Sequence, residues 1–339
     1  MADALVQHQA HLARGLECLS GGGSGRGRVY HALARRRGSR FPGGRCEAPT
    51  PAKTMRLTVA GSPTPVLPKE VRRIGVIGDT GCRLEGGAVQ DCNDPQAWPF
   101  PAIARRAAGH KPDLVIHVGD YYYRKTPCPA ERTGCVGSAY GDSWTTWLAD
   151  FFTPAAPLLS AAPWVTVRGN HELCNRGGHG WFRLLDPHIA SSECTAFSDP
   201  YVPHLGGLNL LVLDSADADD FSAPAEKVAA YATQLAGLLK VASSHAWLLT
   251  HRPVWALAQG KLAGQSINAT LQTAIRRQIP PALASANAFR TFFPSISVPM
   301  SGALPSGSSV SPLSPTISSC RAASTISRAM NSDPSGRRS

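Results

Sequence analysis

The stretch PDLVIHVGD, Pro112–Asp120, shows how the middle of this chain is organised. It is a short apolar run of strand length that ends in Gly-Asp. Runs that are apolar on both faces indicate strands buried on both sides. The same design recurs four more times, in Arg72–Asp79, Ala162–His171, Leu208–Ser215 and His245–Pro253.

Helical patterns lie between these runs, at residues 95–108, 143–159 and 223–241. In the last of them Val228, Tyr231, Leu235 and Leu238 recur at helical spacing. Strands that alternate with helices predict a layered α/β fold, with mixed β-sheets flanked by helices. Polar residues collect at the ends of the strands, where ligands bind in open α/β sheets.

The two ends of the chain differ in composition from the middle. Residues 1–54 are rich in Gly and Arg, and residues 286–339 hold fifteen serines. Neither end has a sustained helical or strand period, so we expect both to be disordered. A shifted reading frame would also explain the abrupt change after residue 285. We therefore predict one domain over residues 55–285, incomplete at its C-terminal end.

The net charge of +11 also belongs to the ends. Residues 1–54 carry +6 and residues 286–339 carry +4, which leaves about +1 for the middle. A basic tail can contact phosphate backbones, but a neutral middle does not indicate nucleic acid as the partner. No apolar run reaches the length of about 18 residues that a membrane span needs. The oligomeric state has no signal in the sequence.

Six of the nine cysteines form three close pairs: Cys82 with Cys92, Cys128 with Cys135, and Cys174 with Cys194. Pairs borne on loops favour disulfides and an extracytoplasmic compartment, periplasmic or secreted. Six reduced thiols in a cytoplasmic enzyme are the alternative. Residues 1–20 have no signal-peptide pattern, which conflicts with export. A true start near Met55 would resolve the conflict.

Four of the five strands end in a short polar signature: Gly78-Asp79-Thr80-Gly81, Gly119-Asp120-Tyr121-Tyr122-Tyr123, Gly169-Asn170-His171-Glu172 and Thr250-His251. Glycine before an acid or amide lets the chain turn tightly. Carboxylate, phenolate, amide and imidazole groups suit iron, manganese or zinc. Each signature alone is weak evidence, since Gly-Asp is often only a turn. Four of them in fixed order predict a metal site.

The series GDTG, GDYYY, GNHE and TH resembles the motifs of the calcineurin-like metallophosphoesterases, in the form found in purple acid phosphatases. The resemblance covers about residues 70–255. It implies a metal-dependent hydrolase of small-molecule phosphomonoesters or phosphodiesters. The implied cofactors are two divalent or trivalent ions, iron together with iron, zinc or manganese.

The resemblance also implies residue roles. Asp79 binds one metal, Asp120 bridges both, and Tyr123 binds the ferric ion. Asn170 and His251 bind the second metal. His171 contacts the phosphate or protonates the leaving group, and Asp120 and His171 are the implied catalytic residues.

Two departures from the family pattern stand out. Gly81 takes the place where many relatives carry a metal-binding histidine, which makes Tyr123 the compensating ligand. The family also closes its site with a GHxH motif, whereas no histidine follows His251. His179 and His204 are further imidazoles, expected to be ordinary loop residues. The missing motif leaves an alternative function: a degenerate pseudo-phosphoesterase that binds metal weakly and turns over little.

Overall fold

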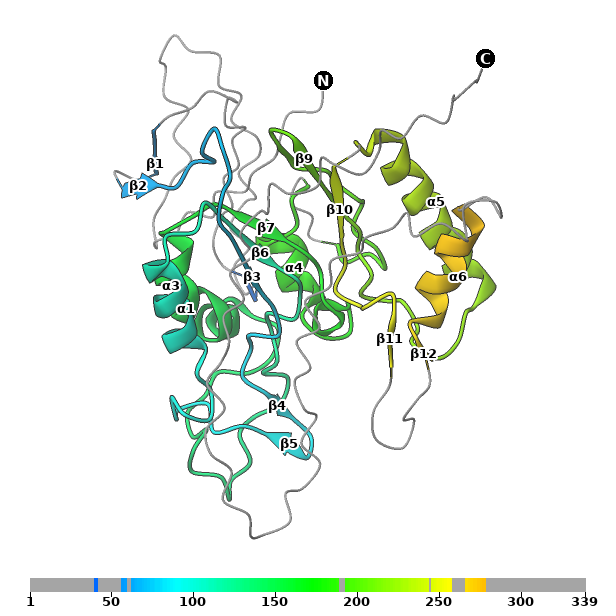
Figure 1. The fold of residues 1–339 in the computed structure, drawn as a ribbon. Helices are drawn as coiled ribbons and strands as arrows, with labels where there is room; N and C mark the ends of the chain where they lie inside the picture. The colour runs from blue at the N-terminus through cyan, green and yellow to red at the C-terminus, as the bar shows by residue number, and fades with distance from the viewer. Residues whose placement is uncertain are drawn as a thin grey trace, which may run out of the picture.

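The computed structural model describes residues 40–41, 56–59, 62–188, 193–243, 245–257 and 266–278. The predicted disorder of residues 1–54 and 286–339 lies outside these residues, apart from 40–41. Within them, the chain forms two three-stranded sheets with helices on their outer faces (Figure 1). The predicted layered α/β class is confirmed. Among the described residues, no helix combines the length and apolar character needed to cross a bilayer.

The first sheet contains the first three predicted strands, all parallel and in the order β3–β6–β7. Ile74 pairs with Leu114, and Val115 pairs with Trp164. The strands span Ile74–Ile77, Leu114–His117 and Trp164–Thr166.

The second sheet has the order β10–β9–β8. Strands β9 and β10 are parallel, and they correspond to the fourth and fifth predicted strands. The short strand β8 pairs with β9 in the antiparallel direction. The three strands span His204–Leu205, Leu208–Val212 and Ala246–Leu249.

An apolar layer joins the two sheets, and its side chains are Leu114, Ile116, Val165, Val167, Leu205, Leu210, Val212 and Leu249. Residues that alternate with these point outward, because successive side chains of a strand face opposite sides. Val115 therefore packs against the helices of the first sheet, and Leu211 against those of the second. This burial on both faces is why β6, β7 and β9 read as continuous apolar runs, whereas the edge strands β3 and β10 are mostly half-buried.

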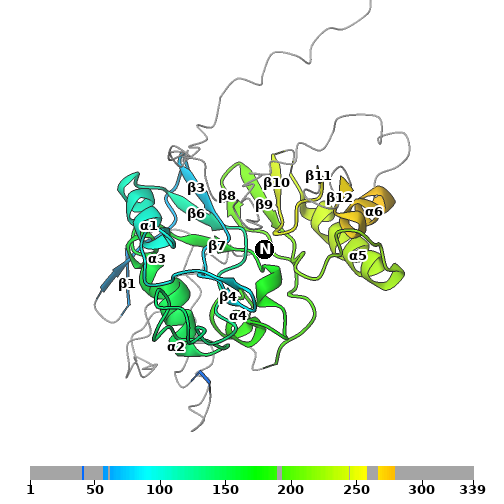
Figure 2. The same cartoon turned by 90° about the horizontal axis from the view of Figure 1, so that it is seen from below.

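Helices cover the outer face of each sheet, so the molecule has four layers in the order helix, sheet, sheet, helix (Figure 2). The first sheet is covered by α1 and α3, and the second by α5 and α6. These helices span Phe100–Gly109, Thr153–Leu159, Ala225–Val241 and Ala269–Gln278.

The three predicted helices are present, with two differences. Helix α1 begins five residues later than expected, directly after Pro99. The segment expected as one helix over 143–159 consists of α2 (Trp144–Trp147), a π-helical turn (Leu148–Phe152) and α3. The Ser143 side chain accepts a hydrogen bond from the Thr146 N–H and caps its start.

The remaining elements are short, and the sequence patterns did not predict them. Helix α4 (Gly178–Leu184) follows the third signature. Among the described residues, a 3₁₀ turn over Asn170–Glu172 and three two-stranded antiparallel pairs are the other elements. The pairs are β1 (Leu57–Val59) with β2 (Ser62–Thr64), β4 (Leu84–Glu85) with β5 (Ala88–Val89), and β11 (Ala256–Leu257) with β12 (Ser266–Ile267).

All three predicted cysteine pairs are disulfides: Cys82–Cys92, Cys128–Cys135 and Cys174–Cys194. Each closes a loop of 7 to 20 residues. Such cross-links restrict the unfolded chain and therefore stabilise the loops around the strand ends.

Replacing Ile116 by alanine should lower the free energy of unfolding by about 2–5 kcal/mol, because the residue is fully buried between the sheets and the change leaves a cavity. Urea denaturation of the purified protein measures this difference. The matched control is Val136→Ala, since Val136 is 61% exposed and should change stability little. Equal effects of the two variants would contradict the placement of the core.

Candidate metal and phosphate site

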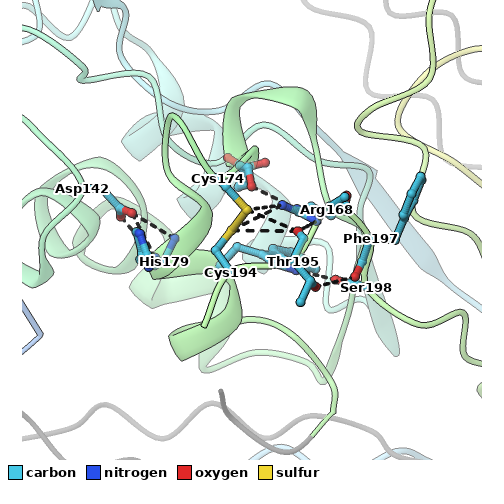
Figure 3. Close-up of a disulfide and its surroundings, with 12 residues drawn as sticks. Asp142, Arg168, Cys174, His179, Cys194, Thr195, Phe197 and Ser198 are labelled. Atoms are coloured by element: carbon cyan, nitrogen blue, oxygen red, sulfur yellow. Dashed lines mark hydrogen bonds between the residues drawn. A yellow bond between two sulfur atoms is a disulfide. The ribbon is translucent and has the colours of Figure 1, made fainter. Parts of the chain in front are cut away.

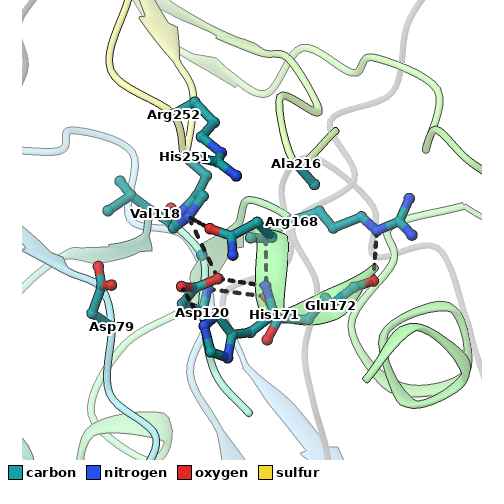
Figure 4. Close-up of polar contacts among 12 residues, drawn as sticks. Asp79, Val118, Asp120, Arg168, His171, Glu172, Ala216, His251 and Arg252 are labelled. Atoms are coloured by element: carbon teal, nitrogen blue, oxygen red, sulfur yellow. Dashed lines mark hydrogen bonds and ion pairs between the residues drawn. The ribbon is translucent and has the colours of Figure 1, made fainter. Parts of the chain in front are cut away.

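The four polar signatures meet at one edge of the molecule. Three follow β3, β6 and β7 of the first sheet, and the fourth follows β10 of the second. Parallel strands bring their carboxyl ends to the same edge, so side chains from distant parts of the sequence converge there. Figure 4 shows Asp79, Asp120, His171 and His251 around this edge.

Asp120 lies at the centre of the cluster. Its Oδ2 accepts a hydrogen bond from the Tyr123 hydroxyl at 2.7 Å, and the same hydroxyl lies 2.8 Å from Asp79 Oδ1. Asp120 Oδ1 accepts a hydrogen bond from the His171 backbone N–H at 2.9 Å and lies 3.4 Å from His251 Nε2. Oδ2 of Asp120 therefore faces a first set of possible ligand atoms, from Tyr123 and Asp79, and Oδ1 faces a second set that includes His251.

His251 completes the second set. Its Nε2 lies 2.9 Å from Asn170 Oδ1, and its Nδ1 lies 2.9 Å from the Val118 carbonyl oxygen. A carbonyl oxygen can only accept, so Nδ1 donates a proton to it. Nε2 faces two oxygen atoms, those of Asn170 and Asp120, and the space between these three atoms is where a proton or a cation would sit. A metal-ligating histidine has the same arrangement, with its second ring nitrogen donating to a carbonyl. The structure thus brings all six predicted site residues together.

The backbone at the site adopts conformations that are rare for residues with a side chain. Asp79 has φ 53° and Asp120 has φ 62°, both in the left-handed region. Such strain tends to occur at functional sites, where the surrounding structure maintains it. Gly119 has φ 105°, and a Cβ there would lie 2.6 Å from His251 Nδ1. Only glycine lets these two strand ends approach so closely.

The space beside Gly81 is filled by Tyr123. A Cβ at Gly81 would lie 2.7 Å from Tyr123 Cδ2 and 2.9 Å from Asp150 Oδ2. No side chain can therefore enter the site from this position, and the tyrosine ring occupies the place instead. This packing supports the expectation that Tyr123 compensates for the histidine that Gly81 replaces.

Glu172 is a supporting residue for which the sequence gave no role. Its carboxylate is fully buried and accepts hydrogen bonds from four backbone N–H groups at 2.9 to 3.1 Å, those of Asp120, Tyr121, Tyr122 and Gly169. It joins the second signature to the third. Its position in the motif GNHE was visible, but the backbone amides that it serves were not.

Asp150 supports the first two signatures in a similar way. Its carboxylate accepts from the backbone N–H groups of Cys82 and Tyr123 at 2.7 and 2.8 Å, and from Arg124 Nε at 2.9 Å. Asp150 and Arg124 are both buried and form an ion pair. This pair fixes the backbone at Tyr123, and with it the direction of the phenol.

Arg168 supports the third signature through a hydrogen bond to its backbone. Its Nε donates to the Glu172 carbonyl at 2.9 Å, and its Nη1 pairs at 3.1 Å with Asp214, which follows β9 of the second sheet. The guanidinium also lies 3.8 to 3.9 Å from both sulfur atoms of the Cys174–Cys194 disulfide (Figure 3). The fully buried arginine therefore connects the site, a disulfide and the other sheet.

Two other histidines do not join the cluster. His204 hydrogen-bonds Asn209 at 2.8 Å within the second sheet. The backbone N–H of His179 donates to Asp142 at 3.0 Å, and its side chain is exposed. They were expected to be loop residues, and this was wrong, because His204 lies in β8 and His179 lies in α4.

The donor set fits metal ions. The Tyr123 hydroxyl donates hydrogen bonds of 2.7 and 2.8 Å to its two carboxylate neighbours, which brings three oxygen ligands suited to hard cations together. Among the described residues, no group of three His, Cys, Asp or Glu side chains is arranged to hold a metal. Tyr123 and Asn170 lie outside those four residue types, and each has a side-chain oxygen in the cluster.

Electrostatics also favour a cation here. Desolvation and the Asp120 carboxylate raise the pKa of Asp79, so the two acids repel each other. Burial and the same two carboxylates raise the pKa of Tyr123. A cation between these groups would reverse both effects, because bound metal ions dominate the local charge.

His171 has one ring nitrogen without a partner. Its Nδ1 is buried and has no hydrogen bond, while its Nε2 lies 3.9 Å from Asp120 Oδ2. Burial lowers the pKa of His171 to about 4, so the ring is neutral near pH 7. Buried polar atoms are usually satisfied, so this unpaired nitrogen makes His171 a candidate for contact with a ligand.

The chain belongs to the calcineurin-like phosphoesterase family, whose model matches residues 72–257. Two solved structures are similar. The purple acid phosphatase PPD1 from yellow lupin (Lupinus luteus) seeds shares 16% identity at a TM-score of 0.35, with 62% of this chain and 36% of that one covered. The structure of PhoD shares 12% identity at a TM-score of 0.37, with 66% of this chain and 51% of that one covered. This chain thus spans 36% and 51% of their lengths, and with such low TM-scores neither is evidence for a shared activity. No curated protein matches the chain.

Replacing Glu172 by glutamine should lower the free energy of unfolding by about 1–3 kcal/mol, because the amide NH₂ would face backbone N–H donors. Chemical denaturation measures the effect. Glu70→Gln is the control, since Glu70 is exposed and pairs only with the exposed Arg72 at the surface. A Glu172 variant as stable as the control would show that the four hydrogen bonds are not important for the fold.

Proposed function

We propose that this chain hydrolyses phosphoester bonds at a site that holds two metal ions. The observation that carries the proposal is the position of Asp120. One of its oxygens faces Tyr123 and Asp79, and the other faces His251 and Asn170. Two cations held close together need a shared anion, and Asp120 is placed to be that bridge.

The residues divide into two ligand sets. Asp79 and Tyr123 would hold one ion with Asp120, and Asn170 and His251 would hold the other. A phenolate ligand suits ferric iron, and the second set suits iron, zinc or manganese. Bound there, the ions would lower the pKa of a water molecule and neutralise charge on the phosphoryl oxygens.

The chain itself would position the substrate. His171 lies against the Tyr123 ring, with 3.8 Å between ring centroids, and so borders the first ligand set. A neutral imidazole offers one N–H, which suits a hydrogen bond to a phosphoryl oxygen. Of the two roles that the resemblance implies for His171, this low pKa favours phosphate contact over proton donation near neutral pH.

A second candidate function is a degenerate phosphoesterase with weak metal binding. It is favoured by one observation, which is that no histidine follows His251 in this chain. Relative to the family pattern, each ligand set is then short of one imidazole. Metal analysis of the purified protein separates the two candidates: about two ions per chain favours the enzyme, and a value near zero favours the degenerate form.

The proposed substrate is a small-molecule phosphoester. The basic excess at the two ends lies almost wholly outside the described residues, so it gives no support to nucleic acid as the partner. The three disulfides support an extracytoplasmic location, periplasmic or secreted, because structural disulfides persist in oxidising compartments.

Replacing Asp120 by alanine should abolish hydrolysis of p-nitrophenyl phosphate and remove most of the bound metal, because both ligand sets lose their shared oxygen donor. Phosphatase assays and elemental analysis provide the two measurements. Asp199→Ala is the control, since Asp199 is exposed and outside the cluster. A variant that keeps both its metal and its activity would remove Asp120 as the bridge.

Replacing His171 by alanine should lower kcat about 10²-fold, the usual effect of removing one donor to the reacting group. The metal content should stay close to that of the wild type, because this side chain contributes to neither ligand set. If the metal is lost together with the activity, His171 is a ligand and its proposed role is wrong.

A further inference from the structure

We infer that Arg83, Lys125 and Arg176 form a cationic rim that binds a second anionic group on the substrate, beyond the phosphoryl group that is cleaved. The inference rests on the proposed function and names a substrate class for the same site. None of these three residues belongs to the four signatures.

The hairpin of β4 and β5 supplies the first part of the rim. Leu84 is fully buried, so the alternating side chains of Arg83 and Glu85 lie on the opposite face of this strand. The Arg83 guanidinium carbon lies 5.0 Å from the centre of the Tyr123 ring. Because Tyr123 belongs to the first ligand set, this contact places Arg83 beside that set.

Lys125 and Arg176 supply the second part. Lys125 follows Tyr123 by two residues and forms an ion pair with Glu85. Arg176 Nη1 donates to the Asn170 carbonyl oxygen at 3.4 Å and so lies next to the second ligand set. The backbone N–H of Gly177, the residue after Arg176, donates to the His171 carbonyl oxygen at 3.0 Å, so Arg176 lies beside this residue.

The charges of the rim are not balanced. Glu85 neutralises Lys125, but among the described residues Arg83 and Arg176 have no carboxylate within 4.0 Å. Asp79 and Asp120 would be neutralised by the proposed ions. The rim therefore keeps an excess of positive charge next to His171, where the phosphoryl group would sit.

A substrate with one phosphoryl group and a neutral remainder would leave this excess unused. A substrate with a second phosphate or a carboxylate would use it, because the guanidinium group forms strong, often bidentate hydrogen bonds with either anion. The rim accordingly favours substrates such as a phosphoanhydride or a phosphorylated carboxylic acid over simple aryl phosphates.

The test compares three substrates with the metal-loaded protein: p-nitrophenyl phosphate, pyrophosphate and phosphoglycolate. In Arg176→Gln and in Arg83→Gln, kcat/KM for at least one of the two doubly anionic substrates should fall about tenfold or more, mainly through KM. The loss with p-nitrophenyl phosphate should be several-fold smaller. Pyrophosphate and phosphoglycolate distinguish a second phosphate from a carboxylate, and Arg176→Lys should recover part of the loss.

Arg106→Gln is the matched control. Arg106 is exposed in the last turn of α1, which precedes the amino end of β6 and so lies opposite the site. Losses of equal size with all three substrates, or no loss with any of them, would overturn the rim while leaving the proposed hydrolysis intact. A wild-type protein that turns over none of the three substrates would overturn both.

Discussion

A single buried carboxylate holds the site in shape. Glu172 accepts four backbone N–H groups from two separate loops, and its own carbonyl oxygen is held by the buried Arg168. Because backbone amides cannot be left unpaired in the interior without a large cost, these loops have few alternatives to this arrangement. The strained conformation at Asp120 is therefore maintained by its surroundings, and the proposed metal ligands are preorganised by the fold.

Preorganisation also explains how the site tolerates its departures from the family pattern. The Tyr123 ring fills the space beside Gly81, and Asp150 fixes the backbone from which the ring projects. The phenol is thus held against both Asp79 and Asp120 without help from a histidine. The same rigidity suits the proposed rim, since Arg83 packs on the same ring.

Much of the fold could be predicted because strands buried on both faces leave a simple trace in the sequence. The five apolar runs follow from the burial of the strands. The polar residues at their ends stand out because they interrupt these runs at the edge where open sheets bind ligands. Helix α4 was not predicted, because it contains two glycines, which are unfavourable in helices. One of them, Gly180, is required by packing, since a Cβ there would lie 1.8 Å from the Trp147 ring nitrogen. The roles of Glu172 and Asp150 were invisible for a different reason: their partners are backbone amides, which every residue has.

The ligand sets do not come from one sheet. His251 follows the last strand of the second sheet, 133 residues along the chain from the Val118 carbonyl that orients it in the first. The proposed ions would therefore bind residues of both sheets at once, and their binding free energy would stabilise the contact between the two sheets. By linkage, removing the ions would loosen the junction between the sheets, and chelators should make this protein easier to unfold as well as inactive.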